Sequence, residues 1–206
     1  MRKGYLLLVI TFSVVSLIAM ACQKETSEKV SILFVGNSLT YSNDLPALVK
    51  KAALNQGHLI ETDMLALPDY SLEDHWNDGQ LQELLQNNKY DFVIIQQGPS
   101  SQAEGRKILF DYGAKINELC KEHNAILVYF MVWPAHANYI NFDGVINNYT
   151  EASQHTNSIL CPVGKEWKQY IDNTGDLSYY GPDLIHPSLK GSEVTAEIIF
   201  KTIIGN

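Results

Sequence analysis

The sequence predicts an α/β fold, a three-layer α/β/α sandwich around a five-stranded parallel sheet. Five short apolar segments alternate with longer segments of helical periodicity, the pattern of strands joined by crossover helices. Residues 125–133 form an uninterrupted apolar run, as expected for a central strand that is covered on both faces. A length of 206 residues fits one domain, and the chain shows no internal repeat or low-complexity tract.

The expected elements follow one another along the chain. A helix from residue 45 has Pro46 in its first turn, where the missing N–H costs nothing, and a helix from residue 71 has Ser71 as its N-cap. Strands are expected at residues 30–35, 59–67, 91–97, 125–133 and 158–163. Helices are expected at residues 45–56, 71–87, 102–123, 142–156, 164–173 and 188–204.

The N-terminal residues have the pattern of a secretory signal. Arg2 and Lys3 precede an apolar run over residues 6–21, which is shorter than the about twenty residues that a membrane span needs. The run ends at Ala19-Met20-Ala21-Cys22, which resembles the bacterial lipobox, where the cysteine is lipidated.

This resemblance implies a lipoprotein signal peptide over residues 1–21, lipidation at Cys22 and a polar tether over residues 22–29. The domain proper would then span residues 30–206 and lie in the bacterial cell envelope, on the periplasmic or surface face, held to the membrane by its lipid. The alternative is an ordinary secretory signal that is cleaved near Ala21, with the cysteine incidental.

Composition excludes several function classes. The formal charge is −8, and it becomes −10 when Arg2 and Lys3 leave with the signal peptide, so the sequence does not favour nucleic acid as a partner. Cys120 and Cys161 lie in apolar segments and are interpreted as small buried hydrophobic residues rather than a disulfide framework. No spacing of Cys and His resembles a zinc site, and we expect neither a metal nor an organic cofactor.

Polar clusters follow four of the predicted strands. Because ligands bind beyond the carboxyl ends of parallel strands, these clusters mark the expected site. They comprise residues 37–38, 68–71, 96–101 and 134–138. In the first cluster, Ser38 follows its strand directly on a Gly36-Asn37 turn, where the next helical segment can present backbone N–H groups to an oxyanion.

A serine hydroxyl becomes a nucleophile only when a base takes its proton and a carboxylate orients that base. Of the six histidines, only His186 follows a carboxylate, Asp183, within a loop. The sequence therefore predicts a catalytic triad of Ser38, His186 and Asp183.

Two blocks of the sequence resemble those of the SGNH/GDSL hydrolases. Residues 34–40 resemble the first block, with Asn37 in place of the usual aspartate, and residues 183–187 resemble the last block, Asp-x-x-His-Pro. The resemblance covers residues 30–204 and implies a flavodoxin-like arrangement of the sheet. It also implies that Ser38 is the nucleophile and one oxyanion donor, His186 the general base and Asp183 its orienting carboxylate.

The two middle blocks depart from the pattern of these hydrolases. No glycine follows the second strand, so the backbone N–H of Tyr70 or Ser71 is expected to serve as the second oxyanion donor. In the third block, either Gln97 or Ser100 stands where the usual asparagine would be, and both remain open as the third donor. Asn37, Trp133 and His136 are candidates for the substrate pocket, with a buried loop anchor as the alternative role of Trp133.

These features predict a serine esterase that acts through an acyl-serine intermediate. The resemblance suggests O-acetyl or short acyl groups on a carbohydrate as its substrate. The alternative is a noncatalytic glycan-binding surface lipoprotein on a degenerate hydrolase fold, which the irregular middle blocks motivate.

Overall fold

The computed structural model describes residues 29–205 and contains one five-stranded sheet. All strand pairs are parallel, in the order β2-β1-β3-β4-β5. The strands are β1 (Val30–Gly36), β2 (Ile60–Ala66), β3 (Phe92–Ile95), β4 (Ile126–Phe130) and β5 (Ile159–Cys161). The predicted fold class and all five predicted strands are confirmed.

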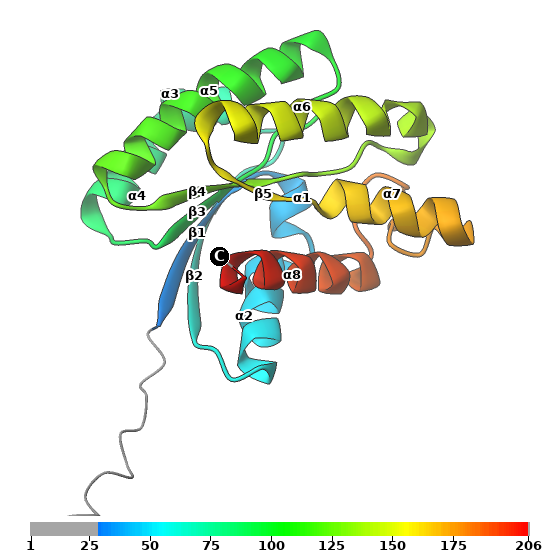
Figure 1. Cartoon of the computed structure of the whole chain (residues 1–206), viewed down its shortest axis with the longest axis horizontal. Helices are drawn as coiled ribbons and strands as arrows, with labels where there is room; N and C mark the ends of the chain where they lie inside the picture. The colour runs from blue at the N-terminus through cyan, green and yellow to red at the C-terminus, as the bar shows by residue number, and fades with distance from the viewer. Residues whose placement is uncertain (1–28, 206) are drawn as a thin grey trace, which may run out of the picture.

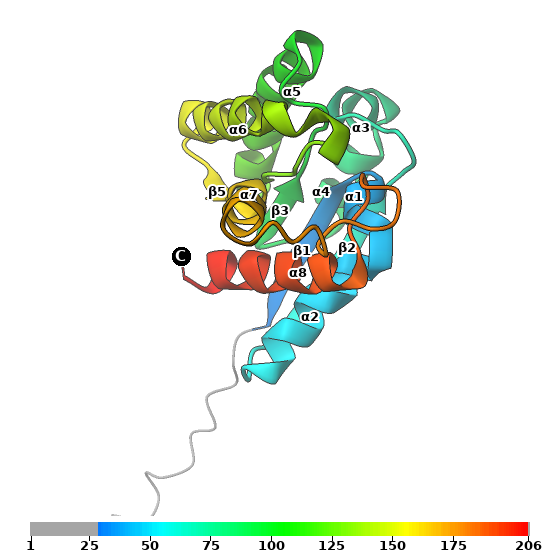
Figure 2. The same ribbon diagram turned by 90° about the vertical axis from the view of Figure 1, so that its right-hand side faces the viewer.

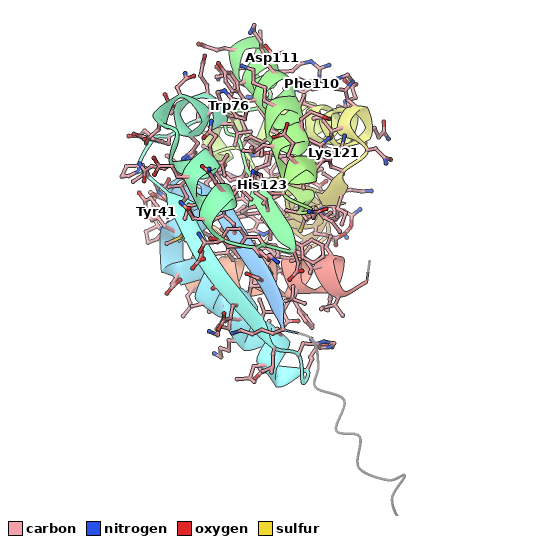
Figure 3. The ribbon with its side chains drawn as sticks, turned by 90° about the vertical axis from the view of Figure 1, so that its left-hand side faces the viewer. Tyr41, Trp76, Phe110, Asp111, Lys121 and His123 are labelled. Carbon is pink, nitrogen blue, oxygen red and sulfur yellow. The ribbon has the colours of Figure 1, made fainter. Side chains whose placement is uncertain are left out.

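Helices cover both faces of the sheet (Figure 1). Helices α3, α4, α5 and α6 lie on one side, and α2 and α8 pack together on the other, with α7 between α6 and α8 (Figure 2). The helices are α1 (Ser38–Tyr41), α2 (Leu45–Asn55), α3 (Leu72–Asp78), α4 (Gln80–Asn87), α5 (Ala103–Glu122), α6 (Phe142–Thr156), α7 (Val163–Thr174) and α8 (Leu189–Ile204). Two short 3₁₀ helices, η2 (Ser42–Asp44) and η3 (His136–Asn141), precede α2 and α6. Figure 3 faces the β2 edge and shows Trp76 of α3 and Phe110 of α5 in the same layer.

The two largest differences from the expected elements are a divided helix and a shortened strand. The single helix predicted over residues 71–87 is divided at Gly79, whose φ of 87° is left-handed and ends α3 before α4 begins. Ser71 caps α3 as predicted, in a reciprocal pair with Asp74. The fourth strand is shorter than its apolar run, because residues 131–133 stay buried after the strand has ended at Phe130.

The central strands β1, β3 and β4 supply the middle of the core. Ile32, Leu33, Phe34 and Val35 of β1 are all fully buried, as a strand with helices on both faces requires. Cys120 and Cys161 are free and buried, as expected, and burial raises the pKa of each thiol to about 12.

Several predictions concern the N-terminus. The signal peptide, Cys22 and all of the tether except Lys29 lie outside the described residues and stay predictions. Within residues 29–205, no helix has the length and hydropathy that crossing a bilayer requires. The same residues contain no cluster of three His, Cys, Asp or Glu side chains suited to a metal ion.

Gly113 of α5 allows close contact with β4, since a Cβ at this position would lie 2.3 Å from the hydroxyl of Tyr129. We expect Gly113→Ala to lower the free energy of unfolding by about 1–3 kcal/mol through overpacking, measured as a lower urea midpoint. Tyr129→Phe removes the clashing oxygen, so the double variant should recover part of the loss. Simple additivity of the two substitutions would show that this contact is not the cause.

Candidate active site

The candidate nucleophile, Ser38, follows a tight turn that requires a glycine at position 36. Strand β1 ends at Gly36, and Ser38 is the first residue of α1. A Cβ on Gly36 would lie 2.4 Å from Oγ1 of Thr40 and 2.7 Å from Nε2 of Gln96, closer than real Cβ contacts. The side chain of Asn37 caps α1 by accepting the N–H of Leu39 at 3.2 Å. Ser38 is therefore held just beyond the carboxyl end of β1, one of the three inner strands of the sheet.

Three side chains from opposite ends of the chain form a hydrogen-bonded line. Oγ of Ser38 lies 2.9 Å from Nε2 of His186, and Nδ1 of His186 lies 2.6 Å from Oδ2 of Asp183. Because a carboxylate only accepts, Nδ1 carries the proton and donates it to Asp183. Nε2 then has a lone pair that can accept the Ser38 hydroxyl. The structure thus brings the three residues of the predicted triad together.

The loop that carries Asp183 and His186 is shaped by a left-handed residue. Leu184 has φ 58°, an unfavourable conformation for a residue with a branched side chain. Oδ1 of Asp183 offsets that cost by accepting the N–H groups of Ile185 and His186, both at 3.0 Å. The hydrogen bond to His186, followed by these N–H groups, lowers the pKa of Asp183 to about 2, so the carboxylate stays ionised at neutral pH.

The segment after β4 holds this loop at three points. Nε1 of Trp133 donates to the carbonyl of Ile185 at 3.0 Å, and the N–H of His136 donates to the carbonyl of Leu184 at 2.9 Å. The hydroxyl of Tyr180 donates to the carbonyl of Pro134 at 2.8 Å. Trp133 also stacks on the buried Trp167, at 3.6 Å between ring centroids and 11° between planes. Trp133 is therefore an anchor of the triad loop, the alternative role expected for it.

The side chain of Asn37 joins three strand ends. Its Nδ2 donates to the carbonyl of Tyr70, beyond β2, at 3.1 Å. Its Oδ1 accepts Nε2 of Gln96, at the end of β3, at 2.7 Å, in addition to the N–H of Leu39. Asn37 also lines the cavity beside Ser38, so its predicted place at the pocket is observed together with a structural role.

The candidate oxyanion donors differ in whether their N–H groups are engaged. The N–H of Ser38 belongs to the first turn of α1, where helical N–H groups have no intrahelical acceptor. In contrast, the N–H of Tyr70 donates to the carbonyl of Leu67 at 3.3 Å, and that of Ser71 donates to Asp74 at 2.8 Å. The structure therefore leaves neither Tyr70 nor Ser71 with a free backbone donor.

The two candidates for the third oxyanion donor, Gln97 and Ser100, also differ in whether their polar side chains already have hydrogen-bond partners. Oε1 of Gln97 accepts the N–H of Leu72 at 2.9 Å, and its Nε2 donates to the carbonyl of Gly98 at 3.1 Å. This amide is engaged internally and does not line the cavity beside Ser38. Ser100 does line that cavity, is 1% exposed, and its hydroxyl has no hydrogen-bond partner among the described residues.

A cavity of about 230 Å³ opens beside Ser38. Its walls come from the segment after β3, the segment after β4, η3, the start of α6 and the triad loop. Trp133 lines this cavity as well, so it combines the pocket position and the anchoring role that the sequence left as alternatives, whereas His136 does not line the cavity. The ring of His136 instead packs near Tyr139 and Tyr180, each at 6.0 Å between ring centroids.

Three further residues support the strand ends around the site: Gln96, Tyr149 and His75. The buried hydroxyl of Tyr149 accepts the N–H of Gln97 at 2.7 Å and donates to its carbonyl at 2.8 Å, which fixes the backbone after β3. Nε2 of the buried His75 donates to the carbonyl of Gly36 at 2.8 Å. Both Tyr149 and His75 lie in the middle of helices, and no local sequence signal says that they reach strand ends.

Comparison with known proteins supports the fold. No protein-family model and no curated protein matches the sequence, but several solved structures do match the described fold. A protein from Slackia heliotrinireducens, assigned as an SGNH hydrolase, is 23% identical over 85% of this chain and 99% of that chain, with a TM-score of 0.72. A family 3 carbohydrate esterase from Clostridium thermocellum is 14% identical over 86% and 96%, with a TM-score of 0.66. An acetylxylan esterase from Geobacillus stearothermophilus is 13% identical over 86% and 96%, with a TM-score of 0.62. The chain thus has the SGNH hydrolase fold.

His75 makes stability depend on pH. Its pKa lies below the usual 6.5, mainly because burial disfavours the imidazolium, so on acidification the unfolded chain binds a proton that the folded protein resists. Stability should therefore fall as the pH drops below about 6.5 towards the folded pKa.

We expect His75→Gln, which keeps an amide donor for Gly36 and cannot titrate, to lose less stability than the wild type between about pH 7.5 and about pH 5.5. Urea midpoints at both pH values measure the difference. Equal losses in the two proteins would contradict the role of a neutral buried imidazole.

Proposed function

We propose that this protein is a serine esterase that hydrolyses small carboxylic esters through an acyl-serine intermediate. The observation that carries the proposal is the line from Ser38 through His186 to Asp183, with distances of 2.9 Å and 2.6 Å. The distances and the inferred tautomer suit transfer of the serine proton to Nε2.

In the acylation step, Nε2 of His186 accepts the proton of Ser38 as Oγ attacks the carbonyl carbon of the ester. The tetrahedral intermediate then collapses and the bond between that carbon and the alcohol oxygen breaks. The imidazolium gives its proton to the departing alcohol. The acyl group stays on Ser38, and Asp183, ionised at neutral pH, stabilises the imidazolium that forms between the two proton transfers.

In the deacylation step, Nε2 of His186 accepts a proton from water while the water oxygen attacks the acyl carbon. Collapse of the second tetrahedral intermediate releases the carboxylic acid and returns the proton to Ser38. The negative charge on the carbonyl oxygen needs donors in both steps. The N–H of Ser38 and the hydroxyl of Ser100 suit this role best, because the alternatives at residues 70, 71 and 97 have internal partners.

The size of the cavity supports a short acyl group. At about 230 Å³ it is smaller than the roughly 300–1,000 Å³ of pockets that take drug-sized ligands, and a long fatty acyl chain would not fit inside it. Two similar structures are named as an acetylxylan esterase and a carbohydrate esterase. We therefore propose an O-acetyl or similarly short acyl group on a carbohydrate as the substrate.

The triad is tested by hydrolysis of p-nitrophenyl acetate. Ser38→Ala should abolish turnover above background, and Asp183→Asn should lower kcat about 10³- to 10⁴-fold, because the imidazole loses its orienting acceptor. A fluorophosphonate probe should label the wild type and leave Ser38→Ala unlabelled. An unlabelled wild-type protein that still binds glycans would instead support the noncatalytic alternative.

The third oxyanion donor is tested by comparing two substitutions. Ser100→Ala should lower kcat for p-nitrophenyl acetate about 100- to 1,000-fold with little change in KM, as expected for a donor used in the transition state. Gln97→Ala should act mainly on stability, since this amide ties β3 to the start of α3. A larger loss of kcat in folded Gln97→Ala than in Ser100→Ala would reverse the assignment.

A further inference from the structure

We propose that the cavity beside Ser38 selects esters of neutral polyhydroxyl alcohols, and that Gln102, Asn138 and Asn141 bind the hydroxyl groups of the substrate. The inference rests on the proposed esterase function and deepens it. It assigns a substrate class by charge and gives a role to three residues that the triad does not use.

The first observation is the lack of charge in the cavity wall. Among the described residues, the wall contains no Asp, Glu, Lys, Arg or His side chain. A ligand carboxylate, phosphate or ammonium that moved from water into this space would lose hydration without gaining an ionic partner. The formal charge of −8 for the whole chain adds a field that repels anions at longer range. Charged esters are therefore disfavoured in binding, and anionic esters are disfavoured in approach as well.

Two helix N-termini border the cavity and require separate consideration, because such ends attract anions. Gln102 is the N-cap of α5, and Asn141 is the N-cap of α6. Each helix already has an acidic residue in its first turn, Glu104 in α5 and Asp143 in α6. These carboxylates offset the positive ends of the two helices, so the helix ends do not turn the cavity into an anion site.

The second observation concerns side-chain amides at the cavity rim. Asparagine is a preferred N-cap, yet neither Asn141 nor Gln102 makes a side-chain bond to its own helix. Asn138 of η3 lines the same cavity. Each amide offers both donors and an acceptor, which matches hydroxyl groups that also donate and accept. Three neutral amides around one cavity therefore suit a polyol better than an ion.

Apolar side chains complete this rim. Ile185 of the triad loop lines the cavity and is 48% exposed, and the partly buried Leu39 of α1 lines it as well. Exposed aliphatic groups beside amides form an amphipathic surface. A sugar ring has matching chemistry, with C–H groups on its faces and hydroxyls at its edge.

The test uses two monoacetylated glycosides that differ by one carboxylate and keep their other hydroxyl groups free. Methyl 2-O-acetyl-β-D-xylopyranoside is neutral and has free hydroxyl groups at C3 and C4, and methyl 2-O-acetyl-β-D-glucopyranosiduronate has the same acetyl and hydroxyl positions plus a carboxylate at C5. We expect kcat/KM for the neutral ester to exceed that for the uronate by about tenfold or more. Equal or faster hydrolysis of the uronate would overturn the proposal.

The amides are tested as a specificity ratio, kcat/KM for the xyloside divided by that for phenyl acetate, which has no hydroxyl groups on its alcohol. Asn138→Ala and Asn141→Ala should each lower this ratio about 2- to 12-fold, the range for one neutral hydrogen bond. The matched control is Asn147→Ala, an exposed asparagine of α6 away from the cavity, which should leave the ratio unchanged. An unchanged ratio in both cavity variants would refute the role of the amides.

Measurements of ligand binding distinguish this inference from the esterase proposal. Ser38→Ala should bind the neutral acetylated xyloside, measured by saturation-transfer NMR, and bind the uronate more weakly. If the wild type hydrolyses no ester but this preference persists, the esterase proposal fails and the inference stands. If phenyl acetate is hydrolysed but the preference is absent, the inference fails and the esterase stands.

Discussion

The side-chain amide of Asn37 is the interaction on which the site depends. It lies between the last residue of β1 and the serine, and it accepts from Leu39 and Gln96 while donating to the carbonyl of Tyr70. A single planar group thus fixes the start of α1, the end of β3 and the loop after β2 relative to one another. Because all three bonds are partly buried, losing one would leave an unpaired polar atom at a cost of about 1–3 kcal/mol.

This arrangement explains why an asparagine fits at a position where the SGNH/GDSL pattern usually has an aspartate. An aspartate can accept from Leu39 and Gln96, but an ionised carboxylate cannot donate to the carbonyl of Tyr70. Residue 37 therefore has to match the loop after β2, whose N–H groups at positions 70 and 71 are used internally. The departures in the first and second blocks are thus parts of one hydrogen-bond pattern.

The fold and the line of triad residues were predictable because their signals are local. Apolar runs mark the strands, and Ser38, Asp183 and His186 each follow a recognisable turn. The third block was not predictable, since Gln97 and Ser100 are equally plausible donors until tertiary contacts are known. Leu72 and Gly98 engage the amide of Gln97, and only packing around the cavity leaves the hydroxyl of Ser100 unpaired. The roles of His75 and Tyr149 likewise arise from helices that dock over strand ends far away in sequence.

The direction of β1 places the start of the domain and Ser38 on opposite sides of the molecule. The strand starts at Val30, at the end of the sheet where all strands begin, and runs about 20 Å to Gly36, at the end where they finish, next to Ser38. Any segment that precedes Val30 therefore joins the domain at the end of the sheet opposite Ser38. A domain held close to a surface by its N-terminus would carry Ser38 on the side that faces away from that surface, towards molecules arriving from the surrounding medium.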